Sequence, residues 1–269
     1  MHKLSISRAW DEMRDVLRRD GGLVATVALA LMVLPGTVSA MAQPLTPAGQ
    51  MAPVGWWSIL GLLALLIGVV GQLAVAQIAL GRRQSVGQAI AHGGRRTPAF
   101  LGAILLWVLP LMLVFAPFAP QLQANPQNPP PTALLVAFLL TLVLIFVGVR
   151  LLMTTPVASA EPVGPVGILK RSWSLTKGHW WRLFGFLVLF FIAAFIVMGA
   201  ITTVVGVLIG LADGPPEQWS VGALVLALAS QILSAAMTVL LVVMVTRLYL
   251  QLAAPQEEMQ ATVDVPKAP

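Results

Sequence analysis

Four long stretches of this sequence contain no Asp, Glu, Lys or Arg, and they constrain the fold more than any other feature. They cover residues 21–81, 97–149, 183–212 and 218–246 of the 269-residue chain. One helical crossing of a bilayer needs about 20 apolar residues, so each of the first two stretches can hold two crossings. The last two can hold one crossing each. The chain therefore has room for six membrane spans.

Prolines mark the breaks inside the two longest stretches, because proline removes a helix hydrogen-bond donor. Residues 42–53 contain three prolines and residues 116–131 contain six, so both segments are predicted to be loops. The predicted fold class is all-α: a polytopic membrane protein with six transmembrane helices and cytoplasmic interfacial amphipathic helices. The spans are predicted near residues 22–41, 54–80, 98–116, 132–155, 181–211 and 220–250.

Composition excludes several other classes of protein. Only 10% of the residues are charged and 58% are hydrophobic, whereas a soluble domain has about 25% charged residues. So few charges cannot cover the surface of a water-soluble fold of this length. The chain has no cysteine, which excludes disulfide scaffolds, thiolate metal sites and cysteine nucleophiles. A transmembrane barrel is disfavoured because residues 62–70 and 134–149 do not alternate between apolar and polar positions.

Positive charge lies on one side of the predicted topology. The loops after the first, third and fifth spans contain no Lys or Arg. Because cytoplasmic loops are enriched in these residues, both termini are predicted to be cytoplasmic. Residues 1–20 are then a cytoplasmic amphipathic helix, residues 21–252 the membrane domain and residues 253–269 a disordered cytoplasmic tail. An alternative for the first span is a cleaved signal peptide with residues 23–34 as its apolar region.

Two segments beside the spans have the spacing of amphipathic helices, which lie in the membrane interface. In residues 4–19, Trp10 and Met13 belong to an apolar series opposite a charged face, and residues 163–178 show a similar pattern. The net charge of +6 predicts attraction to anionic lipid. Nucleic acid is not a predicted partner, because the basic residues are divided among segments that border spans.

The segment 156–185 contains an ordered set of residues between two predicted spans. A proline and an acidic residue follow the fourth span, and a basic pair, Ser-Trp and Leu-Thr-basic-Gly lead into the fifth. These positions are Pro156, Glu161, Lys170, Arg171, Ser172, Trp173, Leu175, Thr176, Lys177 and Gly178. The pattern resembles bacterial proteins of the glycerophosphoryl diester phosphodiesterase membrane domain family and related uncharacterised families.

That resemblance implies a membrane domain without catalysis, in the bacterial plasma membrane. In the family the phosphodiesterase is a separate soluble barrel, for which this chain has no room. From the residues themselves, Pro156 is predicted to end the fourth span, and Gly164, Pro165 and Gly167 to form a turn. The candidate contacts to lipid headgroups are Lys170, Arg171, Trp173, Lys177, Trp180, Trp181 and Arg182.

The sequence offers no candidate catalytic, cofactor-binding or metal-binding residues. His92 and His179 lack metal-ligand spacing and are predicted to be solvated. The predicted function is therefore a non-enzymatic accessory protein or scaffold that organises anionic lipid, or an unidentified partner protein, at the cytoplasmic face. One alternative is an integral membrane enzyme.

A second alternative is a small-solute transporter or channel subunit. It rests on polar residues within the spans. Such residues can line a path for a solute, but they can also form hydrogen bonds that hold two helices together. These residues are Gln72, Gln77, Arg150, Ser230, Gln231, Ser234 and Arg247. Gly206 and Gly210 form a Gly-x-x-x-Gly pair in the fifth span, which predicts close helix packing there.

Overall fold

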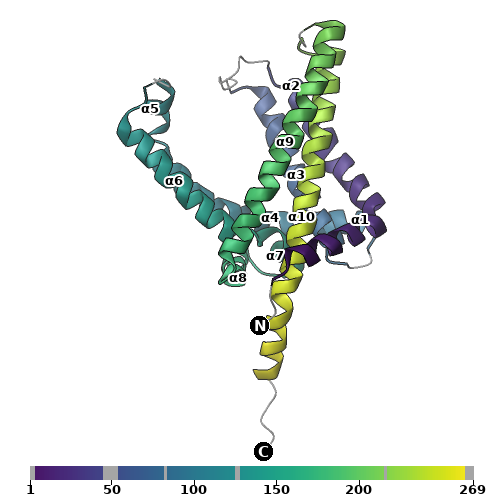
Figure 1. The fold of residues 1–269 in the computed structure, drawn as a ribbon, viewed down its shortest axis with the longest axis vertical. Helices are drawn as coiled ribbons and strands as arrows, with labels where there is room; N and C mark the ends of the chain where they lie inside the picture. The colour runs from purple at the N-terminus through teal and green to yellow at the C-terminus, as the bar shows by residue number, and fades with distance from the viewer. Residues whose placement is uncertain (1–3, 45–53, 82–83, 125–127, 215–216, 264–269) are drawn as a thin grey trace, which may run out of the picture.

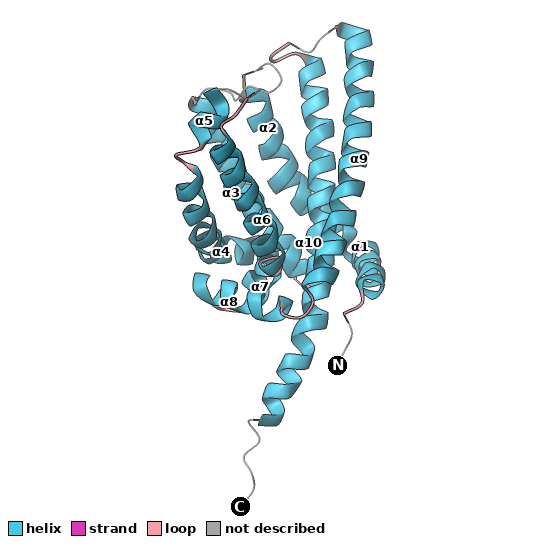
Figure 2. Ribbon diagram, turned by 60° about the vertical axis from the view of Figure 1, so that its left-hand side comes forward, coloured by secondary structure: helices cyan, strands magenta, loops and turns pink. Residues whose placement is uncertain are grey.

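The structure is a computed structural model that describes residues 4–44, 54–81, 84–124, 128–214 and 217–263. Every regular element in these ranges is helical (Figures 1 and 2), which confirms the all-α class. The elements are α1 (Ile6–Ala28), a π-helix η1 (Leu29–Val33), α2 (Leu34–Ala42), α3 (Trp56–Ala79), α4 (Val86–Phe115), α5 (Ala119–Ala124), α6 (Pro131–Arg150), α7 (Thr154–Ala160), α8 (Pro165–Thr176), α9 (Trp180–Asp213) and α10 (Val221–Val263).

Among the described residues, six helical segments are long and apolar enough to cross a membrane, which confirms the predicted number of spans. They cover Ile6–Ala42, Trp56–Ala79, Val86–Phe115, Pro131–Ala160, Trp180–Ala212 and Val221–Ala253. Figures 1 and 2 show the start of α1, the end of α10, α7 and α8 toward the bottom of the bundle. The end of α9, the start of α10 and α5 lie toward the top. We call the bottom the basic end, because residues 150–182 carry five Lys or Arg and one Glu, a net charge of 5 − 1 = +4.

The first span is one continuous helix with the segment that precedes it. Helix α1 begins at Ile6 and passes into η1 and α2 without a break, so the predicted segment 1–20 is not a separate helix in its described part. No proline precedes Pro35 in the chain, and glycine weakens a helix without ending it. In Figure 1 the dark purple start of α1 lies across the basic end before the chain rises into α2.

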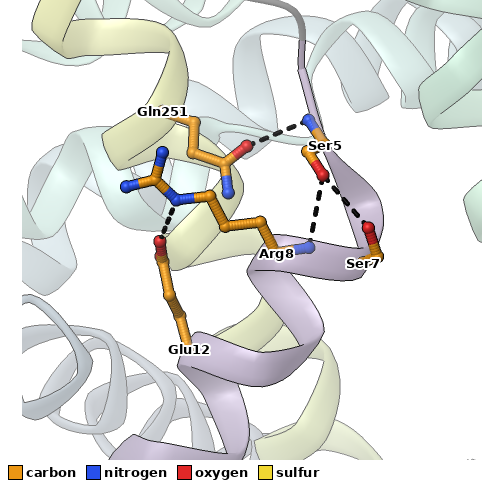
Figure 3. A network of polar contacts seen from close by, with 5 residues as sticks. All are labelled: Ser5, Ser7, Arg8, Glu12 and Gln251. Atoms are coloured by element: carbon orange, nitrogen blue, oxygen red, sulfur yellow. Dashed lines mark hydrogen bonds and ion pairs between the residues drawn. The ribbon is translucent and has the colours of Figure 1, made fainter.

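Polar contacts hold the start of α1 against α10 (Figure 3). The Ser5 amide donates to Gln251 Oε1 at 3.1 Å, which joins residues at opposite ends of the chain. The Ser5 hydroxyl accepts from the Arg8 amide at 3.3 Å and so caps the helix. Arg8 forms an exposed ion pair with Glu12, with 2.8 Å between Nε and Oε1. These contacts fix where the amphipathic part of α1 begins.

The hydrophobic core lies at the basic end, around the second half of α3. Residues 73–79 of α3 are all buried, and they pack with buried side chains of α1, α7 and α10. The first half of α3 and most of α6 and α9 instead expose large apolar side chains, including Leu62, Phe138 and Phe195. Helices that face lipid are expected to expose such side chains, because hydrocarbon is their solvent.

The fourth span reaches Ala160, but its helix is interrupted earlier than the predicted end of the span. Helix α6 stops at Arg150 and a short turn leads into α7, which contains Pro156 as its third residue. The prediction that Pro156 ends the span is therefore wrong. The first residues of a helix have no intrahelical partner for their amides, so proline is tolerated there. Gly164 does precede a helix, but Pro165 and Gly167 lie inside α8.

Other helices extend into segments that were predicted to be irregular. Helix α4 begins at Val86 because Ser85 and Gln88 form a capping box, and it continues through Pro98 and Pro110. Helix α5 lies within the predicted loop 116–131. Helix α10 continues to Val263, so the described part of the predicted disordered tail is helical. Its sequence there, Gln-Glu-Glu-Met-Gln-Ala over residues 256–261, consists of strong helix formers.

The glycine pair of the fifth span does not mediate close packing within this chain. A Cβ atom added at Gly206 or at Gly210 would meet nothing within 4 Å. The close approach is instead at Gly93 in α4, where a Cβ would lie 2.7 Å from the Val70 carbonyl oxygen of α3. This close approach of a helix to the backbone of another lies next to the core at the basic end.

Candidate functional site

The seven predicted headgroup contacts lie on two adjacent elements of the basic end. Four belong to α8 or follow it directly, and Trp180, Trp181 and Arg182 are the first three residues of α9. Gly178 lies between the two helices with φ of 84°, a left-handed conformation that favours glycine. Lys170 and Lys177 are exposed. The structure thus brings the predicted residues together.

Aromatic rings connect α9 to α6 at this end. Trp180 stacks on Phe184 with ring centroids 4.9 Å apart and an interplanar angle of 10°. It also packs against Phe146 of α6 at 5.8 Å, and its Nε1 donates to the Phe146 carbonyl at 3.3 Å. Trp181 meets Trp180 edge-on at 4.7 Å and is 76% exposed. The exposed indole has the amphipathic character of side chains that lie at headgroup depth.

Arg150, the last residue of α6, lies beside Phe146 and Trp173, whose ring centroids are 6.1 Å apart. Its guanidinium carbon is 5.2 Å from the centre of the Trp173 ring and 5.6 Å from that of Phe146. Its Nε and Nη1 atoms are buried and have no hydrogen-bond partner among the described residues. Cation–π contacts hold the guanidinium in place, but they do not replace an acceptor for those two N–H groups.

The backbone of Arg150 is tied to α8. Its carbonyl accepts hydrogen bonds from the hydroxyls of Ser172 at 3.0 Å and Thr176 at 3.1 Å. A carbonyl at the C-terminus of a helix has no intrahelical partner, so these hydroxyls satisfy the end of α6. Trp173 lies between Ser172 and Thr176 in the sequence. The same turn of α8 therefore caps α6 and places an indole against the guanidinium.

Arg171 is part of an internal ion pair. Its Nε lies 2.9 Å from Glu161 Oε1, and the same carboxylate oxygen accepts from the Tyr249 hydroxyl at 2.9 Å. The three side chains come from α8, the α7–α8 connection and α10. Arg171 therefore joins three elements, and we place it in the framework that supports the site.

Two basic residues of α4 hold the end of α7, and the sequence did not indicate this role. Arg96 donates from Nε to the Ala158 carbonyl at 2.7 Å, and from Nη2 to the carbonyls of Val163 at 3.0 Å and Glu161. His92, one turn earlier, lies 2.9 Å from the Ser159 carbonyl through its Nε2. A cation at a helix C-terminus satisfies exposed carbonyls and the helix dipole.

The histidines are less exposed than the prediction of solvated side chains implies. His92 is partly buried, and its Nε2 lies against the Ser159 carbonyl of α7. The Nδ1 atom of His179 is also buried. The only available signal in the sequence was the spacing of four residues between His92 and Arg96, which places them on one face of a helix.

Arg182 connects α9 to the start of the chain, because its Nη1 donates to the Leu4 carbonyl at 3.4 Å. Within the described residues no group of three or more His, Asp or Glu side chains could hold a metal ion. This end of the described structure instead places arginine and lysine side chains beside indole rings, with support from the contacts of Glu161 and Arg96.

Comparison with known protein families gives a match over residues 130–267, which include α6 to α10 and all seven predicted headgroup contacts. The matching family is described as the membrane domain of glycerophosphoryl diester phosphodiesterase. Comparisons with curated proteins and with solved structures gave no match. The match covers half of the chain and confirms the resemblance of segment 156–185. This multi-pass membrane protein belongs to the glycerophosphoryl diester phosphodiesterase membrane domain family.

Proposed function

We propose that this chain is a non-catalytic accessory protein or scaffold of the bacterial plasma membrane that binds anionic lipid at its cytoplasmic face. The observation that carries the proposal is Arg150, whose guanidinium lies beside both Trp173 and Phe146 and has two buried N–H groups without an acceptor among the described residues. A lipid phosphate supplies such acceptors. The exposed Lys170 and Lys177 would add attraction to an anionic leaflet.

The roles of the seven predicted residues differ under this proposal. Trp173 holds Arg150, and Trp181 lies at headgroup depth. Lys170 and Lys177 attract the phosphate electrostatically. Trp180, Arg171 and Arg182 position the elements, since their contacts are with Phe146, Glu161 and Leu4 of this chain.

Replacing Arg150 with glutamine is expected to weaken the binding of anionic lipid. A charge-assisted hydrogen bond contributes about 1.5–3 kcal/mol, which corresponds to at least about tenfold in affinity. Native mass spectrometry of the purified protein with phosphatidylglycerol and phosphatidylcholine measures this directly. Lys170→Ala combined with Lys177→Ala is expected to have a smaller effect.

Arg18→Gln is the matched control, because Arg18 is exposed on α1 and its replacement removes the same charge. The proposal requires this variant to retain phosphatidylglycerol like the unmodified protein. Equal retention of both lipids by the unmodified protein, or equal loss in the two variants, would contradict a specific site at Arg150.

The orientation of the chain can be tested separately. Reporter fusions at residues 125 and 215 are expected to lie outside the cytoplasm, and a fusion at the C-terminus inside it, because the basic end would face the cytoplasm. A membrane-impermeant label on intact cells distinguishes the two sides. Labelling of the C-terminal fusion in intact cells would contradict the proposed orientation.

A further inference from the structure

A cavity of about 260 Å³ lies within the membrane-spanning region, between η1 and α2, α3 and α10. Its polar lining comes from Gln72, Gln231, Ser234 and Thr238. Gly68, which also lines it, is near the middle of the 24-residue α3. A water molecule needs only about 10–15 Å³ of such space, so the cavity has room for a small solute.

A second cavity, of about 220 Å³, lies nearer the end opposite the basic end. Gln231 lines both cavities, so they adjoin each other at this residue. Ser230 also lines the second cavity, as do Gln43, Gln218 and Trp219, which lie where α2 ends and before α10 begins. Figure 1 shows the end of α9 and the start of α10 at that end of the bundle. The two cavities together follow one side of α10 from that end to mid-depth.

Local features of the backbone make this space. The π-helix η1 contributes Met32 to the lining, and π-helical turns are rare and frequent at functional sites. Gly36, one turn after Met32, lies against the Gln231 amide, where a Cβ atom would collide with that side chain. A Cβ atom at Gly68 would meet nothing within 4 Å. The glycines therefore leave room both for the amide and for an occupant.

The lining determines what could occupy the site. Among the described residues, the lining of both cavities includes amides and hydroxyls but no ionisable side chain. A charged solute would lack a counter-charge at this depth, which is energetically costly. An uncharged molecule with several hydroxyl groups could bond to the amides while its carbon atoms contact Met32 and Leu65.

We propose that the two cavities form one binding site for a small uncharged polyol, entered from the aqueous phase at the end opposite the basic end. Toward the basic end the path is closed, because residues 73–79 of α3 are buried in the core. The two cavities are therefore a groove that is open along one side and ends at this core. Transport of a solute across the membrane by this route would require the packed core around residues 73–79 to open.

The absence of cysteine from the chain allows a direct test. Ser230→Cys and Ser234→Cys are conservative and place one thiol in each cavity, one helical turn apart on α10. Both thiols are expected to react with a water-soluble hydroxyethyl methanethiosulfonate. Glycerol, the probe polyol, is expected to slow both reactions by 1 + [L]/Kd, about fourfold at three times its Kd. Glycine betaine at equal osmolality is not expected to slow them.

A space-filling variant completes the experiment. Gly68→Leu in the Ser234→Cys background is expected to abolish labelling and protection, while the protein still elutes as a single folded species. Gly199→Leu is the matched control, because Gly199 is exposed on α9 and a Cβ there meets nothing within 4 Å. Absence of labelling at both cysteines, labelling that glycerol does not slow, or equal effects of the two leucines would overturn the proposal. The retention of phosphatidylglycerol by the Arg150 variant is a separate measurement. It tests the proposed lipid-binding function and not the polyol site.

Discussion

Arg96→Ala is expected to destabilise this protein more than any other single replacement of a charged residue that we consider. The guanidinium donates to the carbonyls of Ala158, Glu161 and Val163, which lie at the end of α7 and in the connection to α8. Removing it leaves these acceptors in a partly buried place without a donor. Because each lost bond from a charged donor costs about 1.5–3 kcal/mol before relaxation and water entry, we expect a net loss of about 2–4 kcal/mol.

The measurement is the unfolding temperature of the purified protein in one detergent, with size-exclusion chromatography to follow folded material. Arg95→Ala is the matched control, because Arg95 is the exposed neighbour on the same helix and carries the same charge. It is expected to change the unfolding temperature little. If the two variants were equally stable, Arg96 would not hold α7 in place.

The consequences of Arg96→Ala should extend to the proposed lipid site. The connection that Arg96 holds includes Glu161, which pairs with Arg171 of α8. Helix α8 in turn places Trp173 beside Arg150. Retention of phosphatidylglycerol by any folded fraction of the variant is therefore expected to fall. This effect would identify Arg96 as a positioning residue that acts through α8.

The number of spans was predictable from the sequence, because a charge in hydrocarbon is costly wherever it occurs along a helix. The length of an uncharged stretch can be counted directly along the sequence, and the six spans confirm the number predicted in this way. The exact ends of the helices were less predictable. Pro98 lies in the interior of α4, and Pro156 is the third residue of α7, near the end of the fourth span. A proline predicts a helix end only when its position in the helix is known.

The partners of the polar residues could not be predicted, because they are distant in sequence. Arg96 and Ala158 are 62 residues apart, and Tyr249 and Glu161 are 88 apart. The sequence grouped Lys170, Arg171 and Arg182 by type, since all three are basic and border a span. Their surroundings separate them, because Lys170 is exposed while Arg171 pairs with a carboxylate. Which basic residue can meet a headgroup is a tertiary property.

Gly93→Ala is expected to have the second largest effect, because α4 approaches the backbone of α3 at this position. The added Cβ would lie 2.7 Å from the Val70 carbonyl oxygen and 3.2 Å from the Ala74 amide nitrogen. Neither backbone atom can rotate away, so the two helices must separate beside the buried residues of α3. Overpacking of a well-packed core costs about 1–3 kcal/mol.

The neighbouring Gly94 provides the control, because a Cβ there would meet nothing within 4 Å. Gly94→Ala gains helix propensity, up to about 1 kcal/mol, and is expected to raise the unfolding temperature or leave it unchanged. Each variant adds one methyl group to the unmodified protein, at adjacent positions of the same helix. The gain in helix propensity is therefore the same in both and cancels when the two are compared. A lower unfolding temperature for Gly93→Ala alone would therefore measure the steric contact between α4 and α3. Equal behaviour of the two variants would mean that these helices do not approach closely at Gly93.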